Sequence, residues 1–482
     1  MVVPKAKAWA SAAPGPGALG ILAFEAAASM SRLVALHRSL SEPEVARLRS
    51  DTMRSQGVAY LVSTDQSLLL RLACAELLSD LDRSAAAVAR FGSRCGDDSP
   101  LVRDFALVYA ALKTGSADLD RFGLRLTGSR VQKKFAKMER FVRATAKLSE
   151  EMEALDELEA AERKMAQRWA RFSGPLPLLK PEASPVICSD SFRLELRSSR
   201  QRVRRFKAES LWCRSFEKAA RLMALSACAL FARICLVFGP FVPGLPPVFI
   251  SDRTRVRFAP VHKLRLSYPW PSSQGKYSSS GPIERRHAAA EDVVRVSNSC
   301  PIFGGGREAN AKAETDWRKV LEASPDTVGA AGLALRYANV VVAAERLLRA
   351  EAAGLEEDAA AEREEIYEML PAAMRSTVRA KLRDWWKDRG PLDRRLAEGW
   401  KEAVERILAW LGPMAHDTVQ WQEERNMDRR RRFDTRPRAL MIQTLHLSNR
   451  EKTEAAIAEV LVGLSCACWY SELPRGPSSF RF

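Results

Sequence analysis

Apolar residues recur at intervals of three and four along most of this 482-residue chain. This spacing places them on one face of an α-helix, because such a helix has about 3.6 residues per turn. The first run contains Leu22, Ala26, Met30, Leu33 and Leu40. Only 8% of the residues are aromatic, while Ala, Leu, Glu and Arg are abundant, which favours helix over sheet. We therefore predict an all-α fold with two helical-bundle regions joined by a disordered, basic linker.

Sequence patterns typical of helix N-termini divide the N-terminal part into short helices. The run SEPE at residues 41–44 has the spacing of a capping box, with proline in the first turn, where its missing N–H costs little. The run STDQ at residues 63–66 gives a second start signal, and a further helix is expected over residues 101–112. We predict a disordered leader at residues 1–18 and an N-terminal helical domain at residues 19–120.

The longest helical pattern covers residues 131–169. Its apolar residues resemble a short coiled-coil seam that is interrupted by a stutter. Packing inside a helical bundle and self-association of two chains through this helix both fit the pattern. Together with the apolar stretch that follows, the helix forms a predicted central segment at residues 131–238. The first part of the seam consists of Met138, Phe141, Thr145, Leu148, Met152 and Leu155.

Pro, Ser, Gly and Arg dominate the next stretch and predict a flexible linker at residues 239–317. Helical patterns then return in a C-terminal helical domain at residues 318–470, which is followed by a tail at residues 471–482.

Three features subdivide this C-terminal domain. Asp326 or Thr327 can cap a helix that begins at Val328, and the small residues at its start leave room for a neighbouring helix. Pro413 is expected to mark a boundary between two helices. Residues 439–470 are expected to form the last helix.

The net charge of +17 attracts anionic partners such as nucleic acid, a membrane leaflet or acidic proteins, although basic linkers can also carry the surplus. A short run of arginines in a predicted loop suits nuclear import or phosphate binding, and a solvated loop is the alternative. The basic stretch at residues 193–207 competes for the same roles. The predicted localisation cluster consists of Arg429, Arg430, Arg431 and Arg432.

The sequence predicts a location in the nucleus and cytoplasm, with peripheral contact at the plasma membrane as the alternative. The N-terminus lacks the apolar core of a secretory signal, and Val2 is incompatible with N-myristoylation. The most apolar window, Leu222–Phe238, is short and contains Arg233, so we expect a buried helix rather than a membrane span. Nine cysteines without a framework spacing are expected to be free thiols.

No motif for catalysis, cofactor binding or metal binding is found. Gly15, Gly17 and Gly20 match a dinucleotide fingerprint only formally, since a Pro-rich tail stands where the motif needs a strand. The five histidines are scattered singly, without a carboxylate or thiol at a ligand or triad spacing. We predict no catalytic residue, no metal site and no cofactor; an enzyme whose site is assembled only in the fold remains the alternative.

Several long blocks resemble the plant phytosulfokine-simulator-like family. They include LGILAFE near the N-terminus, KMERFVRATAKLSEEMEALDELE in the central helix, TVGAAGLALRYANVVVAAERLL after the linker and MIQTLHLSNREKTEAAIAEVLVGL near the end. The resemblance implies positive regulation of plant growth, linked to phytosulfokine peptide-hormone signalling. It also implies an adaptor or scaffold that binds other proteins, since the family offers no catalytic residue to carry over.

Overall fold

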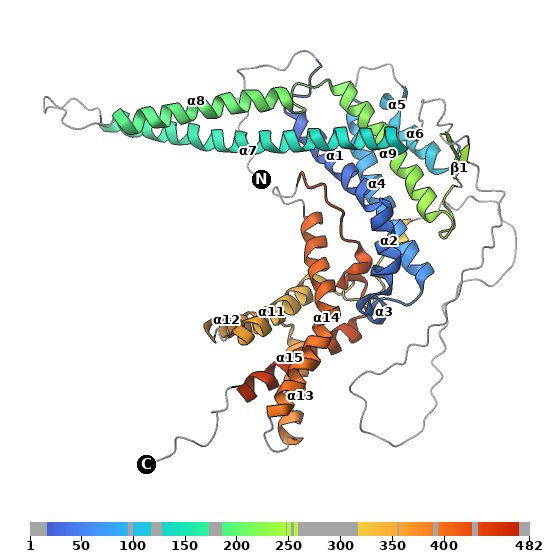
Figure 1. Ribbon diagram of the computed structural model, residues 1–482, viewed down its shortest axis with the longest axis vertical. Helices are drawn as coiled ribbons and strands as arrows, with labels where there is room; N and C mark the ends of the chain where they lie inside the picture. The colour runs from blue at the N-terminus through green and yellow to red at the C-terminus, as the bar shows by residue number, and fades with distance from the viewer. Residues whose placement is uncertain are drawn as a thin grey trace. The chain divides into compact units, whose positions relative to one another are not determined.

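The structure is a computed structural model that describes ten stretches of the chain. All of them belong to one compact unit, formed by residues 1–261 and 316–482 (Figure 1). The second unit, His262–Thr315, lies outside the described residues, and so does most of the predicted linker. The described stretches are 17–94, 100–116, 128–172, 186–246, 248–251, 255–258, 317–353, 356–388, 394–426 and 432–471.

The N-terminal region is built on three long helices, α1, α4 and α9, which pack against one another. Their contact faces carry alanine and leucine, and Ala23, Ala26, Leu69 and Ala73 are fully buried. Short helices cover this core. The bounds are α1 Leu22–Ser39, α2 Glu42–Ser50, η1 Thr52–Arg54, α3 Gln56–Leu61, α4 Gln66–Gly92, α5 Pro100–Arg103, α6 Phe105–Lys113 and α9 Phe216–Phe238.

Both predicted start signals begin helices. Asp65 caps α4 by accepting hydrogen bonds from the backbone N–H groups of Ser67 (2.8 Å) and Leu68 (3.3 Å). Ser41 occupies the N-cap of α2, but its hydroxyl makes no capping hydrogen bond. The helix predicted over residues 101–112 is divided at Asp104 into α5 and α6.

Helix α9 contains the most apolar window of the sequence and lies in the core. Among the described residues it is the one helix long and apolar enough to cross a membrane, and 67% of its apolar window is buried inside the protein. Arg233, which interrupts the apolar window, reaches the surface, where it donates to the carbonyl of Leu40 (3.2 Å) and pairs with Glu42 (2.5 Å). The packing agrees with a buried helix.

Buried side chains and two short strands occur among the described residues between 239 and 258. Val242 and Leu245 are buried, and the guanidinium of Arg49 lies 4.7 Å from the ring centre of Phe241. The strands β1 (Val248–Ser251) and β2 (Arg255–Phe258) follow and pair antiparallel. This small hairpin is a local addition to a fold that is otherwise all-α, as predicted.

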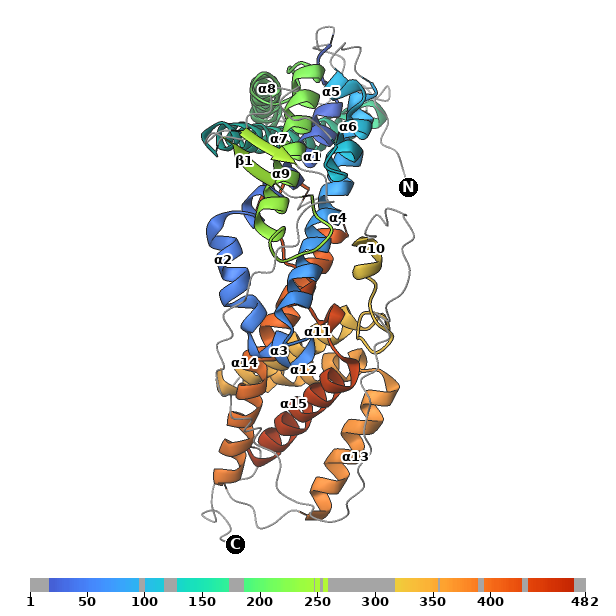
Figure 2. The same cartoon turned by 90° about the vertical axis from the view of Figure 1, so that its right-hand side faces the viewer.

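The C-terminal region is a second group of helices (Figure 2). Helix α11 packs against α12 and α14, and α15 packs against α14, α13 and α11. The bounds are α10 Trp317–Val320, α11 Ala334–Ala353, α12 Glu356–Met369, α13 Ala372–Asp388, α14 Arg394–Arg425, η5 Met441–Gln443, η6 Leu445–Leu447 and α15 Arg450–Ser471.

Two helix starts predicted in this region are wrong. The helix predicted from Val328 begins at Ala334, because the backbone N–H groups of Val328 and Gly329 donate instead to the carbonyls of Ser448 and His446, each at 2.9 Å. A Cβ atom on Gly329 would lie 2.3 Å from that His446 carbonyl oxygen. The small residues there admit a loop, not a neighbouring helix. Residues 439–449 form extended backbone and the two 3-10 helices η5 and η6, and the last helix begins only at Arg450.

The boundary predicted at Pro413 is also wrong. Helix α14 continues through this proline. Leu411, Met414 and Ala415 around it are buried at 0–3% exposure, so tertiary packing holds the helix together despite the lost backbone hydrogen bond.

The predicted central helix is α7 (Gly128–Phe172), which forms a long hairpin with α8 (Val186–Glu209) (Figure 1). Met138, Thr145 and Leu148 of its seam are fully buried, because α1 and α8 both pack against α7. The seam is therefore occupied within the chain. Self-association through this helix stays a prediction and would have to use its other face.

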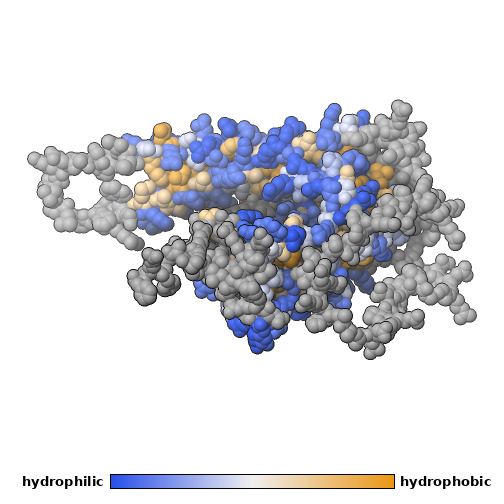
Figure 3. Space-filling model, turned by 60° about the horizontal axis from the view of Figure 1, so that its bottom comes forward, coloured by the Kyte–Doolittle hydropathy of each residue, from blue (hydrophilic) through white to orange (hydrophobic). Residues whose placement is uncertain are grey.

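Side chains toward the far end of the hairpin are exposed. Leu194 of α8 is 69% exposed and Met165 of α7 is 41% exposed. Figure 3 shows apolar surface gathered at this end of the hairpin, on the left of the view, and mainly hydrophilic surface along the rest of the described face.

Candidate functional site

A buried carboxylate lies where the N-terminal and C-terminal regions meet. Glu76 is on α4, between the apolar residues Ala75 and Leu77, and is only 2% exposed. An ionisable side chain at such a position is rarely fully buried unless it is paired. Its partners all come from the C-terminal region, more than 300 residues away in the sequence.

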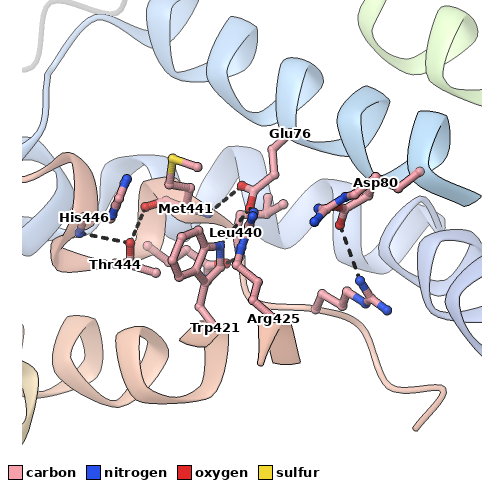
Figure 4. Close-up of polar contacts among 11 residues, drawn as sticks. Glu76, Asp80, Trp421, Arg425, Leu440, Met441, Thr444 and His446 are labelled. Carbon is pink, nitrogen blue, oxygen red and sulfur yellow. Dashed lines mark hydrogen bonds and ion pairs between the residues drawn. The ribbon is translucent and has the colours of Figure 1, made fainter. Parts of the chain in front are cut away.

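Three groups donate hydrogen bonds to Glu76 (Figure 4). Two lie on successive turns of α14: the indole Nε1 of Trp421 at 2.8 Å and the guanidinium of Arg425 at 2.9 Å. The third is the backbone N–H of Met441, at 2.5 Å, where η5 begins. The Arg425 guanidinium also lies 3.9 Å from the centre of the Trp421 ring, and this cation–π contact holds the two donor side chains together. We call Glu76, Trp421, Arg425 and Met441 the junction.

Burial raises the pKa of Glu76, and the neighbouring charge of Asp80 adds to this effect. The hydrogen bonds from Trp421 and Met441 and the charge of Arg425 oppose it. A buried carboxylate with three donors is costly to leave unpaired, so the junction stabilises the contact only while all its partners are in place.

Asp80 continues the contact one turn further along α4. It pairs with Arg83 on the same helix and lies 3.7 Å from Arg438 in the segment that follows α14. The backbone N–H of Arg438 in turn donates to the hydroxyl of Ser39 at the end of α1 (3.3 Å). Residues 432–438 are thus tied to both α1 and α4.

Beside this segment lies a cleft of about 390 Å³ between α1, α4 and the end of α14. Burial, together with the charges of nearby Arg438, Arg83 and Arg432, lowers the pKa of Arg32 in its wall. The cleft balances opposite charges rather than presenting one sign. Its charged lining consists of Arg32, Arg90, Arg432, Arg436, Arg438, Glu25, Glu423, Glu424 and Asp434.

One member of the predicted arginine cluster belongs to this cleft. The carbonyl of Arg432 accepts a hydrogen bond from the hydroxyl of Ser31 (3.1 Å), and its guanidinium lies 5.7 Å from the Phe433 ring. Arg429, Arg430 and Arg431 lie outside the described residues.

The junction was not predicted from the sequence. The available signal was weak: a glutamate on the apolar face of a helix pattern, three residues after Ala73 and one before Leu77. Its donors could not be located, because an indole, a guanidinium and a backbone amide carry no recognisable spacing relative to a residue this distant in sequence.

Among the described free thiols, four are buried and Cys213 is exposed. Cys74, Cys228 and Cys466 are buried, and burial raises the pKa of each to about 12. A thiol is a poor nucleophile when its thiolate is disfavoured. Within the described stretches, no group of three or more His, Cys, Asp or Glu side chains could hold a metal ion.

Two known families match parts of the chain. The first, described as "Domain of unknown function (DUF3475)", matches residues 21–77, and the second, described as "Protein of unknown function (DUF668)", matches residues 327–420. Glu76 lies at the end of the first matched segment, and Trp421 directly follows the second. The chain is therefore a mainly helical protein in which the end of the first matched segment meets, through a buried carboxylate, residues that follow the second matched segment.

Three proteins of Arabidopsis thaliana are similar to the chain. Protein PSK SIMULATOR 1 is 25% identical over 92% of this chain and 55% of its own length, and Protein PSK SIMULATOR 3 is 26% identical over 92% and 56%. Protein PSK SIMULATOR 2 is 29% identical over 46% of this chain and 34% of its own length. The chain spans about half the length of the first two relatives. This similarity supports a phytosulfokine-simulator-like family, which the sequence blocks also indicated. No solved structure matches it significantly.

Proposed function

We propose that this protein is a positive regulator of plant growth in phytosulfokine-type signalling, acting as a non-enzymatic adaptor or scaffold. The observation that carries the proposal is the 25–26% identity to the two PSK SIMULATOR proteins across 92% of the chain. Neither matched family is described by an enzymatic activity.

The α7–α8 hairpin offers a surface for a protein partner. Leu194 is exposed near its end, and Arg197 and Arg204 are exposed on the same helix. An apolar spot beside guanidinium groups fits a protein surface with an apolar anchor and acidic neighbours. Weak electrostatic contact with an anionic membrane or with nucleic acid is the alternative use of the same charges.

Growth complementation tests this proposal. Plants that lack the endogenous protein would receive the full chain, the double variant Met165→Asp/Leu194→Asp or the control Leu107→Asp. Leu107 is 73% exposed on α6, so the control makes a comparable change at a different surface. We expect the wild type and the control to restore growth, and the hairpin variant to lose both growth restoration and its co-purifying proteins.

Two results would reject this role. Wild-type chain that leaves growth unchanged would contradict the regulatory proposal. Turnover of a substrate by the purified protein, with no specific protein co-purifying from plant cells, would contradict the adaptor proposal.

We also propose that the cluster Arg429–Arg432 directs the protein to the nucleus and cytoplasm. Electrostatic tethering to a membrane is screened by salt, and charge alone gives only about 1 kcal/mol for each basic residue near an anionic leaflet. Because Arg432 also lines the cleft, the cluster should be tested in two parts.

A fluorescent fusion would be compared as wild type, as the triple variant Arg429→Ala/Arg430→Ala/Arg431→Ala, and as Arg432→Ala. We expect the triple variant to lose nuclear signal and Arg432→Ala to retain most of it. An unchanged nuclear signal in the triple variant would remove the cluster from this role, and a stable plasma-membrane signal in all three fusions would contradict the nuclear location.

A further inference from the structure

A second cavity lies within the C-terminal region, and none of its lining residues belongs to the junction. It has a volume of about 410 Å³, is partly open to solvent and is lined by residues of four helices. Helix α12 packs on α11 and helix α13 packs on α15, so α12 and α13 form two walls above a floor made by α11 and α15. The volume lies within the range of roughly 300–1,000 Å³ that is typical of small-molecule sites.

The cavity is lined mainly by apolar side chains. Ile366 on α12 and Val378 on α13 face it from the two walls, and Leu347, Leu461 and Leu464 form the floor. These residues are only 2–9% exposed, so they belong to the packed core, and the remaining apolar surface that faces the cavity can contact an apolar ligand body. Removing apolar surface from water is the main source of affinity at such a site.

The charged residues that line the cavity are all arginines: Arg363, Arg375 and Arg379. The cleft beside the junction differs, since four carboxylates accompany its arginines. Arg375 donates to the carbonyl of Leu370 (2.9 Å), and the guanidinium groups of Arg375 and Arg379 lie 5.2 and 5.5 Å from the Tyr367 ring centre. Among the described residues, neither of these two arginines forms an ion pair with a carboxylate.

We propose that this cavity binds a small amphiphilic acid. Its apolar body lies on the leucine floor between α12 and α13, and its carboxylate faces Arg375 and Arg379 at the rim. Apolar contact alone would accept a neutral compound equally well, so the arginines determine the preference for an anion. The site would bring a small-molecule input to a protein whose proposed partners are other proteins, and it does not depend on the adaptor role.

Calorimetric titration of the full chain with three probes of equal chain length tests the proposal: dodecanoate and dodecyltrimethylammonium below their critical micelle concentrations, and dodecanol below its solubility limit. We expect dodecanoate to bind with one-to-one stoichiometry. Dodecanol should bind at least about tenfold more weakly, because a charge-assisted hydrogen bond contributes roughly that factor or more. Dodecyltrimethylammonium should bind most weakly.

Matched variants assign the binding to this cavity. Arg379→Gln should remove most of the preference for the acid while leaving dodecanol binding intact, which also shows that the cavity is still folded. Arg383→Gln is the control, since Arg383 is exposed on the same helix but does not line the cavity. Leu464→Trp should fill the floor and prevent binding of all three probes, and Val378→Phe serves the same purpose from the wall should Leu464→Trp lower the melting temperature.

Equal affinity for dodecanoate and dodecanol would overturn the proposal, as would equal losses in Arg379→Gln and Arg383→Gln. So would the absence of dodecanoate binding when an acidic amphipathic peptide binds and is blocked by Leu464→Trp, because the cavity would then be a docking site for a protein segment.

Discussion

The core of the N-terminal region and the junction with the C-terminal region are both buried, but they are held in different ways. Between α1, α4 and α9 the contacts are apolar, and residues such as Ala27, Met30 and Leu81 have no exposed surface. At the junction a charged group, Glu76, is buried with three polar donors. Apolar packing tolerates exchange of one hydrophobic residue for another, whereas a buried polar group depends on each individual partner.

This difference predicts that the junction is the more sensitive of the two to a single substitution. Glu76→Ala would leave the Trp421 indole, the Met441 N–H and the Arg425 guanidinium without their shared acceptor. Breaking a buried charged pair costs about 3–5 kcal/mol. We expect a loss of that order in the free energy of unfolding, measured by urea denaturation.

The exposed pair Glu44–Arg47 provides the control for this substitution. Its atoms are 2.6 Å apart on α2, but Arg47 is 58% exposed, so Glu44→Ala should cost less than about 0.5 kcal/mol. A double-mutant cycle of Glu76→Ala with Arg425→Ala should show strong coupling. Equal urea midpoints for wild type and Glu76→Ala would show that the junction contributes nothing to stability.

A second prediction tests the close approach of α3 to α14. A Cβ atom on Gly57 would lie 2.7 Å from both the Trp410 carbonyl oxygen and the Met414 sulfur. Gly57→Ala should therefore destabilise the protein by roughly 1–3 kcal/mol, the usual cost of overpacking. Gly399→Ala is the matched control, because nothing lies within 4 Å of the Cβ position there. It should stabilise α14 by up to about 1 kcal/mol. Similar melting temperatures for the two variants would argue against tight packing at Gly57.

A third prediction is that acid affects the two regions in opposite directions. Burial raises the pKa of Asp417 on α14 to about 6, against the smaller opposing effects of Arg47 and His416. Below pH 6 the folded state binds a proton before the unfolded state does, so this group adds stability as the pH falls from about 6 to 4. Burial, followed by the charges of Arg233 and Arg38, lowers the pKa of His37 on α1 to about 4. The unfolded state then binds the proton first, and stability is lost between about pH 6.5 and 4.

Substitutions separate these two contributions. Asp417→Asn should stabilise the protein at pH 8 by roughly 1–2 kcal/mol, allowing for partial exposure, and should have no effect near pH 4. Hydrogen exchange at pH 5 should show α1 less protected, relative to pH 7, and α14 more protected. A parallel change in both helices would contradict the assignment.

The smallest expected effect is at the surface of the α7–α8 hairpin. Arg202 of α8 pairs with Glu151 of α7 at 2.8 Å, and its side chain is 44% exposed. Arg202→Gln should change the free energy of unfolding by about 0.2–1 kcal/mol, less at high salt. A loss as large as that from Glu76→Ala would mean that the hairpin is held by its charges rather than by its buried seam.

The helical framework could be predicted from the sequence because its determinants are local. The face containing Met30 and Leu33, the start at Asp65 and the long α7 all follow from spacing over a few turns. The errors occur where distant contacts override local preference. The backbone N–H groups of Val328 and Gly329 donate hydrogen bonds to Ser448 and His446 instead of forming a helix. The packing around Pro413 keeps this proline within α14.

The candidate site could not be predicted for the same reason. The sequence predicted Arg432 as part of a localisation cluster. Only the fold shows that its carbonyl accepts a hydrogen bond from the Ser31 hydroxyl and that the residue lines a cleft beside α1. Glu76 became recognisable as a functional candidate only once Trp421 and Met441 were seen beside it.

The most direct test of the central claim, that the two regions form one unit held at the junction, is to cut the chain between them after it has folded. A protease site placed within residues 262–315 of the full chain would separate the two parts covalently without altering any described contact. We predict that the two fragments stay together in size-exclusion chromatography, and that the same cut in Glu76→Ala lets them separate. Wild-type fragments that elute apart, each retaining its helical circular dichroism, would contradict the account.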